Sequence, residues 1–426
     1  MKNNIPMDQS HTLCFILGRV PELSGAEALS VLSARGLTPT IRSFTRDALS
    51  VSVTQPVDCV ALMRELGGCI KIGTLSDTSL SGHIHDVHAE TLADGVEMRI
   101  TDSSKRVTIG ISSYTVSQKS LREHRASRRV RQLGLAVKKV LKSRGYSVRV
   151  VAPQLGDTLT SVQVEKNHLT RENGVELLLL AEGDVTRVAL TDAVQEFEEY
   201  SLRDYSRPER SMDVGLLPPK LARMMINLAG VKKDGTLLDP FCGFGTIIQE
   251  ALMVGYSSLV GCDINESTLA AAKKNLAWLS NEKGASLAAV RLISCDARKL
   301  SSTFPANSVD AIVTEPYLGP SVHRSGVKNL SAILRELEQL YTAFFHEAHR
   351  TLKGGAPLVI VLPFWIEERK KTRIPFLPKL LGLGFVSALN TKDLPDFGNL
   401  SDRGSIFVSR PGQHVGRELF VLKKTT

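Results

Sequence analysis

The stretch Leu238-Asp239-Pro240-Phe241-Cys242-Gly243-Phe244-Gly245-Thr246 links an apolar segment typical of a strand to a segment with helical periodicity. Glycines in such a strand-to-helix turn let a ligand lie against bare backbone, at the carboxyl edge of the sheet where α/β folds bind their ligands. The turn is not a phosphate loop, since no Gly-Lys-Ser/Thr follows, and it lacks the third glycine of a dinucleotide fingerprint. Its leading acid suits a ligand that carries a cationic ammonium or sulfonium group.

Strands and helices alternate around this turn, from Lys220 to the end of the chain. Such alternation predicts a mostly parallel sheet covered by helices on both faces, so we expect a Rossmann-like α/β domain. The expected strands are residues 236–240, 258–263, 288–296, 309–317 and 357–364, with a terminal pair at about 405–410 and 418–424; the expected helices begin at about Thr246 and Glu266 and span 332–352.

Two further acids stand at matching places in this alternation. Asp263 ends the second strand, where a carboxylate can accept hydrogen bonds from both hydroxyls of a ribose. Asp296 ends the third strand, where it could accept from an adenine amine. One Asp at a strand end is common, but three acids at successive strand ends of one domain are hard to explain by structure alone.

The segment Thr314-Glu315-Pro316-Tyr317-Leu318-Gly319-Pro320 is expected to reach the same edge from the fourth strand. A carboxylate, a rigid proline and an aromatic ring suit methyl transfer to an exocyclic base amine, whose lone pair is spread into the base. Hydrogen bonds from the amine to a carboxylate and to backbone carbonyls draw that lone pair back toward nitrogen. A ring stacked on the base holds it in line with the methyl carbon.

The N-terminal half is expected to form two small α+β domains, residues 1–117 and 118–197, before the C-terminal domain of residues 198–426. In the first, Ser24 is a plausible N-cap of a helix that Gly36 ends. In the second, a basic helix from about Lys119 to Arg144 precedes three expected strands at 146–152, 160–167 and 175–183. The polar residues 196–220 are interpreted as a connector.

Lys and Arg exceed Asp and Glu by 53 to 44, and the excess is concentrated between Lys105 and Arg149, where Glu123 is the only acid. A solvated helix face normally mixes both signs, so this segment indicates a surface that contacts nucleic-acid phosphates; a merely basic surface is the alternative. The candidate RNA-binding residues are Arg122, Arg125, Arg128, Arg129, Arg131, Lys138 and Lys139.

Composition limits the remaining possibilities. A chain of 426 residues exceeds one ordinary domain, and no apolar run reaches the roughly 18 residues that a membrane-spanning helix needs. The N-terminus has no signal-peptide pattern, so we expect a cytoplasmic protein. The six cysteines are scattered without metal-ligand spacing, and we expect neither a metal site nor a disulfide framework.

At these motifs, and over nearly its whole length, the chain resembles the tRNA guanine-N2 methyltransferases that carry a THUMP domain, the group around the archaeal guanine-10 enzymes. The turn at 239–246 is similar to the family's Asp-Pro-Phe-Cys-Gly-Ser-Gly-Thr motif, and residues 215–229 to the segment before it. The resemblance implies a ferredoxin-like domain, a THUMP domain that grips the acceptor end of tRNA, and a methyltransferase domain that uses S-adenosylmethionine. The cofactor-binding residues that it implies are Asp239, Phe241, Gly243, Gly245, Thr246, Asp263, Ile264, Asp296 and Ala297.

The catalytic loop departs from the family's Asp-Pro-Pro-Tyr. Matching the preceding residues and Gly319 puts Glu315 at the aspartate, whereas matching Pro-Tyr puts Thr314 there. We predict that the Glu315 carboxylate accepts a hydrogen bond from the target amine, that Pro316 and Tyr317 hold the base, and that Thr314 shapes the turn. A DNA amino-methyltransferase and a non-catalytic RNA-binding protein with a decayed loop remain as alternatives.

Overall fold

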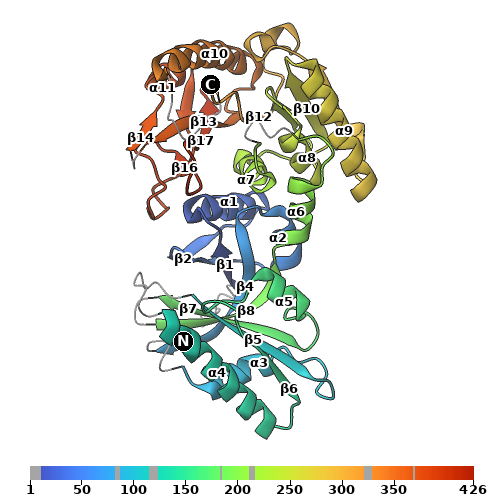
Figure 1. Ribbon diagram of the computed structural model, residues 1–426, viewed down its shortest axis with the longest axis vertical. Coiled ribbons are helices and arrows are strands. Elements are labelled where there is room, and N and C mark those ends of the chain that lie inside the picture. The colour runs from blue at the N-terminus through green and yellow to red at the C-terminus, as the bar shows by residue number, and fades with distance from the viewer. Residues whose placement is uncertain are drawn as a thin grey trace, which may run out of the picture. The chain divides into compact units, whose positions relative to one another are not determined.

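The computed structural model describes residues 11–81, 87–114, 123–182, 185–210, 216–320, 329–367 and 370–426 (Figure 1). The chain folds as two compact units, Met1–Phe197 and Glu198–Thr426. Each is a mixed α/β structure built around its own sheet. None of the helices in the described ranges is long and apolar enough to cross a membrane.

The N-terminal unit contains one eight-stranded sheet with the order β2-β3-β1-β4-β8-β7-β5-β6. Neighbouring strands are antiparallel except β5, which runs parallel to β6 and β7. Strands from both sides of residue 117 lie next to each other, because β4 pairs with β8, so the expected boundary at that residue stays a prediction. The strands are β1 (His11–Leu17), β2 (Thr40–Phe44), β3 (Ala48–Val53), β4 (Cys69–Ser81), β5 (Val107–Tyr114), β6 (Val148–Val151), β7 (Gly174–Glu182) and β8 (Val185–Val194).

Among the described residues, five helices accompany this sheet, and the buried apolar side chains form four separate clusters. In the long helix α4, buried Leu133, Val137 and Leu141 recur at helical spacing, which confirms its expected apolar face. The helices are α1 (Pro21–Ala34), α2 (Cys59–Glu65), α3 (Ala89–Glu97), α4 (Glu123–Ser143) and α5 (Ser161–Lys166).

Two local predictions in this unit are wrong. Residues 160–167 alternate like a strand, but they contain the helix α5, because Thr160 and Gln163 cap each other's backbone in a capping box. Ser24 is not an N-cap: α1 begins at Pro21, and the Ser24 hydroxyl donates instead to the Val20 carbonyl. A proline at the first helical position starts the helix without a side-chain cap.

A buried ion pair lies inside the N-terminal sheet. Lys71 on β4 and Glu176 on β7 have side chains only 1% and 0% exposed, and they contact each other directly. The Lys71 ammonium also donates to the Leu159 carbonyl at 2.8 Å. Glu176 accepts from the hydroxyls of Ser112 and Thr191 at 2.5 and 2.7 Å, so both charges are hydrogen-bonded as well as paired.

The C-terminal unit contains a nine-stranded sheet whose main path is β11-β10-β9-β12-β13-β17-β15, with β14 and β16 attached to β13 and β17. The first five strands of this path, from β11 through β10, β9 and β12 to β13, are parallel to one another, and β17 is antiparallel to its neighbours. The strands are β9 (Thr236–Asp239), β10 (Ser258–Asp263), β11 (Val290–Ser294), β12 (Ala311–Thr314), β13 (Pro357–Glu367), β14 (Lys370–Arg373), β15 (Phe385–Ser387), β16 (Ile406–Val408) and β17 (Val415–Lys424).

Strand order reverses between β9 and β12, which makes a topological switch point at their carboxyl ends. Helices α7, α8 and α9 pack on the strands around it, and α10 covers the 3₁₀ segment Ala297–Ser302 (Figure 1). Part of the expected connector is the helix α6, with Tyr200 and Arg203 buried. The helices are α6 (Phe197–Tyr205), α7 (Pro219–Ala229), α8 (Thr246–Met253), α9 (Glu266–Lys283), α10 (Leu330–Thr351) and α11 (Leu377–Leu381).

Candidate cofactor and substrate site

The switch point is closed by a hydrogen bond between its two strands. Thr314, the last residue of β12, is fully buried, and its hydroxyl donates to Asp239 Oδ1 at the end of β9 over 2.7 Å. Burial raises the pKa of Asp239 to about 7, although the bonds from Thr314 and from the Phe241 amide oppose the shift. The site therefore holds a carboxyl group that changes its charge near neutral pH.

The turn after Asp239 is fixed by Asp263, the last residue of β10. Its carboxylate accepts from the Gly243 amide at 3.0 Å and from the Asn265 amide at 2.9 Å. Gly243 and Gly245 have φ angles of +50° and +82°, in the left-handed region where a side chain is strained. A Cβ on Gly245 would also stand 3.3 Å from the Ala272 side chain, so the turn needs glycine there.

Asp296 is engaged differently from the other two acids. It caps the 3₁₀ segment Ala297–Ser302 and forms a two-pronged contact with the Arg298 guanidinium, which lowers its pKa. Ala297 is buried, whereas Ile264, directly after Asp263, is 63% exposed. An apolar side chain that stands in solvent beside a half-buried carboxylate is typical of a ligand-binding edge.

The carboxylate of Glu315 is held by an arginine that the sequence did not reveal. Arg417 on β17 donates through Nε and Nη2 to the two Glu315 oxygens, at 2.5 and 2.9 Å, and its Nη2 lies 3.4 Å from the Leu216 carbonyl. The two side chains are only 13% and 12% exposed. No motif marks Arg417, because it lies 102 residues away and reaches the loop only through the antiparallel pairing of β17 with β13.

The residues after Glu315 present one ring to solvent. Pro316 is buried, and Tyr317 is 45% exposed although its carbonyl accepts a 2.6 Å bond from the buried Tyr341 hydroxyl. Gly319 has a φ of +95°, and a Cβ there would come within 3.2 Å of Ile333. The backbone of the loop is thus anchored while the Tyr317 ring remains accessible.

Helix α4 carries part of the expected basic surface. Arg128, Arg131 and Lys139 are exposed, and Arg129 and Lys138 are half-buried. Arg125 lies within α4, and Arg122 lies outside the described residues. Arg144, from the same basic segment, pairs with Asp94 and Glu97, so it stabilises the fold instead of offering a free charge.

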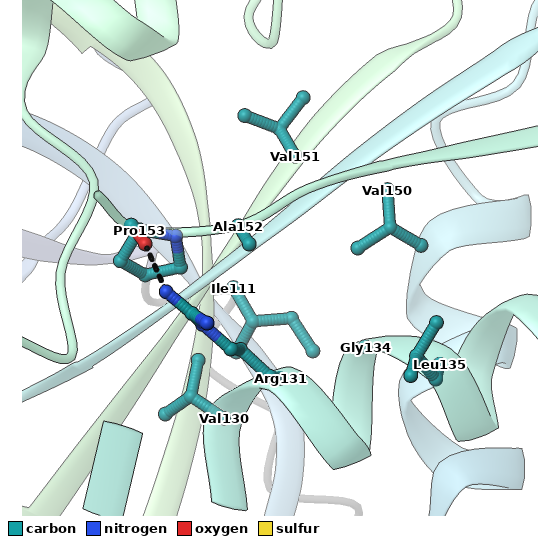
Figure 2. A pocket seen from close by; sticks show the side chains of 9 residues that line it. All are labelled: Ile111, Val130, Arg131, Gly134, Leu135, Val150, Val151, Ala152 and Pro153. Carbon is teal, nitrogen blue, oxygen red and sulfur yellow. Dashed lines mark hydrogen bonds between the residues drawn. The ribbon is translucent and has the colours of Figure 1, made fainter. Parts of the chain in front are cut away.

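An apolar pocket of about 230 Å³ lies between α4 and β6 (Figure 2). Gly134 leaves room for the sheet there, because a Cβ on it would stand 3.1 Å from Val150. Figure 2 shows Arg131 at the pocket, where its guanidinium donates to the Pro153 carbonyl at 3.3 Å. The candidate RNA surface therefore combines cations with an apolar recess.

A second hollow in the N-terminal unit, about 440 Å³ in volume, is rimmed by cations. It lies where β5, β6 and β7 begin, and it includes Lys166 and Arg171, which the sequence analysis did not single out. Five Lys and Arg residues line it with one carboxylate, so its rim is rich in cations, although Lys105 pairs with Asp102 and Glu172, and Arg171 pairs with Glu165. The cations are Lys105, Arg106, Arg149, Lys166 and Arg171, and the acid is Glu172.

Comparisons with known proteins agree with this arrangement. The RMKL-like methyltransferase domain of family UPF0020 matches residues 207–365. The tRNA (guanine(10)-N2)-dimethyltransferase of Methanothermobacter thermautotrophicus is 35% identical over 153 residues, 36% of this chain and 40% of that protein. The probable tRNA (guanine(10)-N2)-dimethyltransferase of Methanothermococcus thermolithotrophicus is 31% identical over 118 residues, 28% of this chain and 70% of that protein.

A solved structure extends the likeness of fold to both units. The crystal structure of TrmN from Thermus thermophilus aligns with 97% of this chain and 100% of that chain, with a TM-score of 0.55 and 18% identity. Strand order, switch-point turn and family match together define the C-terminal unit as a methyltransferase domain. The chain belongs to the family of the tRNA guanine-N2 methyltransferases. It spans 37–44% of the length of the first relatives that it matches.

Proposed function

We propose that the protein transfers a methyl group from S-adenosylmethionine to the exocyclic N2 amine of a guanosine in tRNA. The observation that carries the proposal is the convergence of Asp239, Asp263 and Glu315 at the ends of three adjacent parallel strands, around a glycine turn. Family membership supplies the reaction class, and the exposed Tyr317 ring beside an acid supplies a place for a base.

The residues present fit S-adenosylmethionine. Asp239 would face the ammonium group, and Asp263, which already orients the turn, would accept from the ribose hydroxyls. Ile264 offers the exposed apolar surface that an adenine ring needs. Asp296 has fewer acceptor positions left for an adenine amine, because each of its oxygens already accepts two bonds from Arg298. Phe241, Gly243, Gly245, Thr246 and Ala297 complete the proposed cofactor set. When bound, the cofactor supplies an electrophilic methyl carbon on a sulfonium.

Cofactor affinity is expected to rise with pH up to about 7, the pKa of Asp239 in the free protein. A cation bound beside Asp239 favours its carboxylate form, so binding below this pKa must release a proton, and affinity grows by up to roughly tenfold per pH unit before levelling off. The same pKa shift affects the stability of the free protein. Asp239 keeps its proton up to a pH of about 7 in the folded protein, but an Asp in the unfolded chain loses it near pH 3.8. The contribution of Asp239 to folding stability therefore falls as pH rises from about 3.8 to about 7.

Calorimetric titration at pH 6, in two buffers with different ionisation enthalpies, measures the released proton directly. Asp239→Asn is the control, because an amide has no proton to release and its cofactor binding should show no such pH dependence. Equal heats in both buffers for the wild type would remove Asp239 from the ammonium site.

Glu315 is proposed as the acceptor for the target amine. A carboxylate has about four acceptor positions, and Arg417 uses one on each oxygen, so both oxygens keep capacity for an amine. Thr314 is poorly placed for this role because it is buried and donates its proton to Asp239. Pro316 keeps the loop rigid, and the Tyr317 ring would stack on the base so that its nitrogen points at the methyl carbon.

The N-terminal unit is proposed to bind the tRNA, as a ferredoxin-like part over residues 1–117 followed by a THUMP-like part over 118–197, in the cytoplasm. The exposed cations of α4 and of the basic hollow supply phosphate contacts, and the apolar pocket beside Arg131 offers space for an unpaired base. This arrangement supports an RNA substrate over duplex DNA, which would require base edges to be read in a groove.

Replacing Arg125, Arg128, Arg129 and Arg131 with Ala is expected to weaken tRNA binding and to flatten its dependence on salt. Each lost phosphate contact should reduce the log–log salt slope by roughly 0.9 on duplex regions. A filter-binding series from low to high salt measures the slope, and cofactor titration serves as the control for an intact C-terminal unit. An unchanged slope would mean that this face of α4 does not contact RNA.

The function is tested by incubating the protein with cofactor labelled in its methyl group and either unfractionated tRNA or, in a parallel reaction, duplex DNA. The digested nucleosides are then identified by mass spectrometry. The proposal expects labelled N2-methylguanosine or its dimethyl form. A labelled base methylated at its exocyclic amine in duplex DNA would favour the DNA enzyme, and no transfer to either nucleic acid would favour a binding protein.

A further inference from the structure

A buried arginine, Arg207, lies against the end of the cofactor turn. Arg207 is 3% exposed, and its Nη1 donates to the hydroxyl of Thr246 at 2.7 Å. Its Nε and Nη2 are buried, and among the described residues they have no hydrogen-bond partner. Thr246 is the first residue of α8 and directly follows Gly245 of the turn.

The neighbouring acids do not account for this guanidinium. Glu250 accepts from Arg203 on one oxygen at 2.6 Å and twice from Arg223 on the other at 2.9 and 2.5 Å, and within the described residues it forms no hydrogen bond with Arg207. Burial lowers the pKa of Arg207, and the nearby Asp204 and Glu250 only partly offset it. A buried cation with unmatched donors is costly, and such groups persist in folded proteins when they serve a ligand.

The chemistry of the turn indicates which ligand completes the set. None of the residues proposed above for the cofactor is a cation. Their acids match its ammonium, its sulfonium and its hydroxyls, but no positive charge among them matches its one carboxylate. In an α-amino acid the ammonium and the carboxylate sit on the same carbon, so a site for one must adjoin a site for the other. The turn begins with the acid Asp239 and ends at Thr246, against which the Arg207 cation lies.

We propose that Arg207 binds the carboxylate of the aminoacyl group of S-adenosylmethionine. The amino-terminal end of α8 reinforces this choice, because the partial positive charge of a helix start favours an anion. The assignment rests on the proposed function. It adds a cation to a cofactor site for which the sequence motifs supply none.

The experiment compares two ligands by calorimetry: S-adenosylmethionine and its decarboxylated analogue, which keeps the sulfonium, the amine and the adenosine. The wild type is expected to bind the analogue about 10-fold to 100-fold more weakly, the range for a charged hydrogen-bonded pair. Arg207→Met should lose that preference by weakening only the binding of S-adenosylmethionine. Arg207→Lys, which keeps the charge, should retain part of the preference.

Two further measurements separate a ligand contact from a structural role. Arg210→Met removes an exposed arginine from the same segment and should leave both affinities unchanged. The melting temperature of ligand-free Arg207→Met should equal or exceed that of the wild type, because a buried unpaired charge is removed.

Different failures have different meanings. If the wild type binds both ligands equally, or if Arg207→Met loses the same factor for both, Arg207 does not read the carboxylate and the inference is overturned, while the proposed function stands. If the wild type binds neither ligand, the proposed function is wrong, and the inference about Arg207 is then wrong as well.

Discussion

Glu315→Gln is expected to reduce the rate of methyl transfer to tRNA by about 100-fold or more in a single turnover, with little change in the affinity for either substrate. The substitution keeps the shape of the side chain and removes its charge. The target nitrogen becomes positively charged as the methyl group arrives, and in the variant no carboxylate is present to stabilise this charge. Arg417 loses its counter-ion at the same time, which adds to the effect.

Two controls make this prediction specific. Thr314→Ala removes a buried hydroxyl that bonds to Asp239, so it should cost only on the order of tenfold. Arg417→Met tests whether the ion pair holds Glu315 in place; if it does, the rate should fall while cofactor affinity stays the same. A Thr314 variant that is far slower than Glu315→Gln would show that the Pro-Tyr alignment is right and that Glu315 is not the acceptor.

Lys71→Met is expected to destabilise the N-terminal unit by about 3–5 kcal/mol, because it leaves the Glu176 carboxylate buried without its counter-charge. The double variant Lys71→Met, Glu176→Gln should recover most of this loss. Glutamine carries no charge; its carbonyl oxygen can still accept from one of the two hydroxyls of Ser112 and Thr191, and its NH2 group can donate to the other. A buried ion pair is thus expected to be more costly to break than to replace.

Hydrogen exchange of the amides in β4 and β7 as a function of urea measures this stability. Both tryptophans, Trp278 and Trp365, lie in the C-terminal unit, so their fluorescence follows that unit separately and serves as the internal control. A loss below about 1 kcal/mol, the value typical of exposed pairs, would mean that water reaches the pair in solution.

Much of the C-terminal unit was predictable from its sequence because its signals are local. Alternating apolar segments and helical periodicity predicted the parallel strands, and two of these strands, β9 and β10, end at residues with a proposed chemical role, Asp239 and Asp263. A parallel sheet brings such strand ends to one edge, so sequence order alone places the acids together.

The two arginines were not predictable, for a physical reason. Arg417 meets Glu315 across 102 residues, and Arg207 meets Thr246 across 39, so both contacts depend on tertiary packing and not on local periodicity. The strand predicted at residues 160–167 was wrong for another reason. These residues alternate like a strand, but the reciprocal cap of Thr160 and Gln163 stabilises the helix α5. In such a short segment, capping outweighs the pattern.

The pairing of β4 with β8 constrains the order in which the chain can fold during synthesis. β4 is complete once Ser81 has been made, but its partner ends only at Val194, more than a hundred residues later. Until then one side of β4 is an unpaired strand edge, which invites association with other chains. A nascent chain or fragment that stops before Val185 therefore exposes this edge, and translation must pass the whole N-terminal unit before its sheet can close.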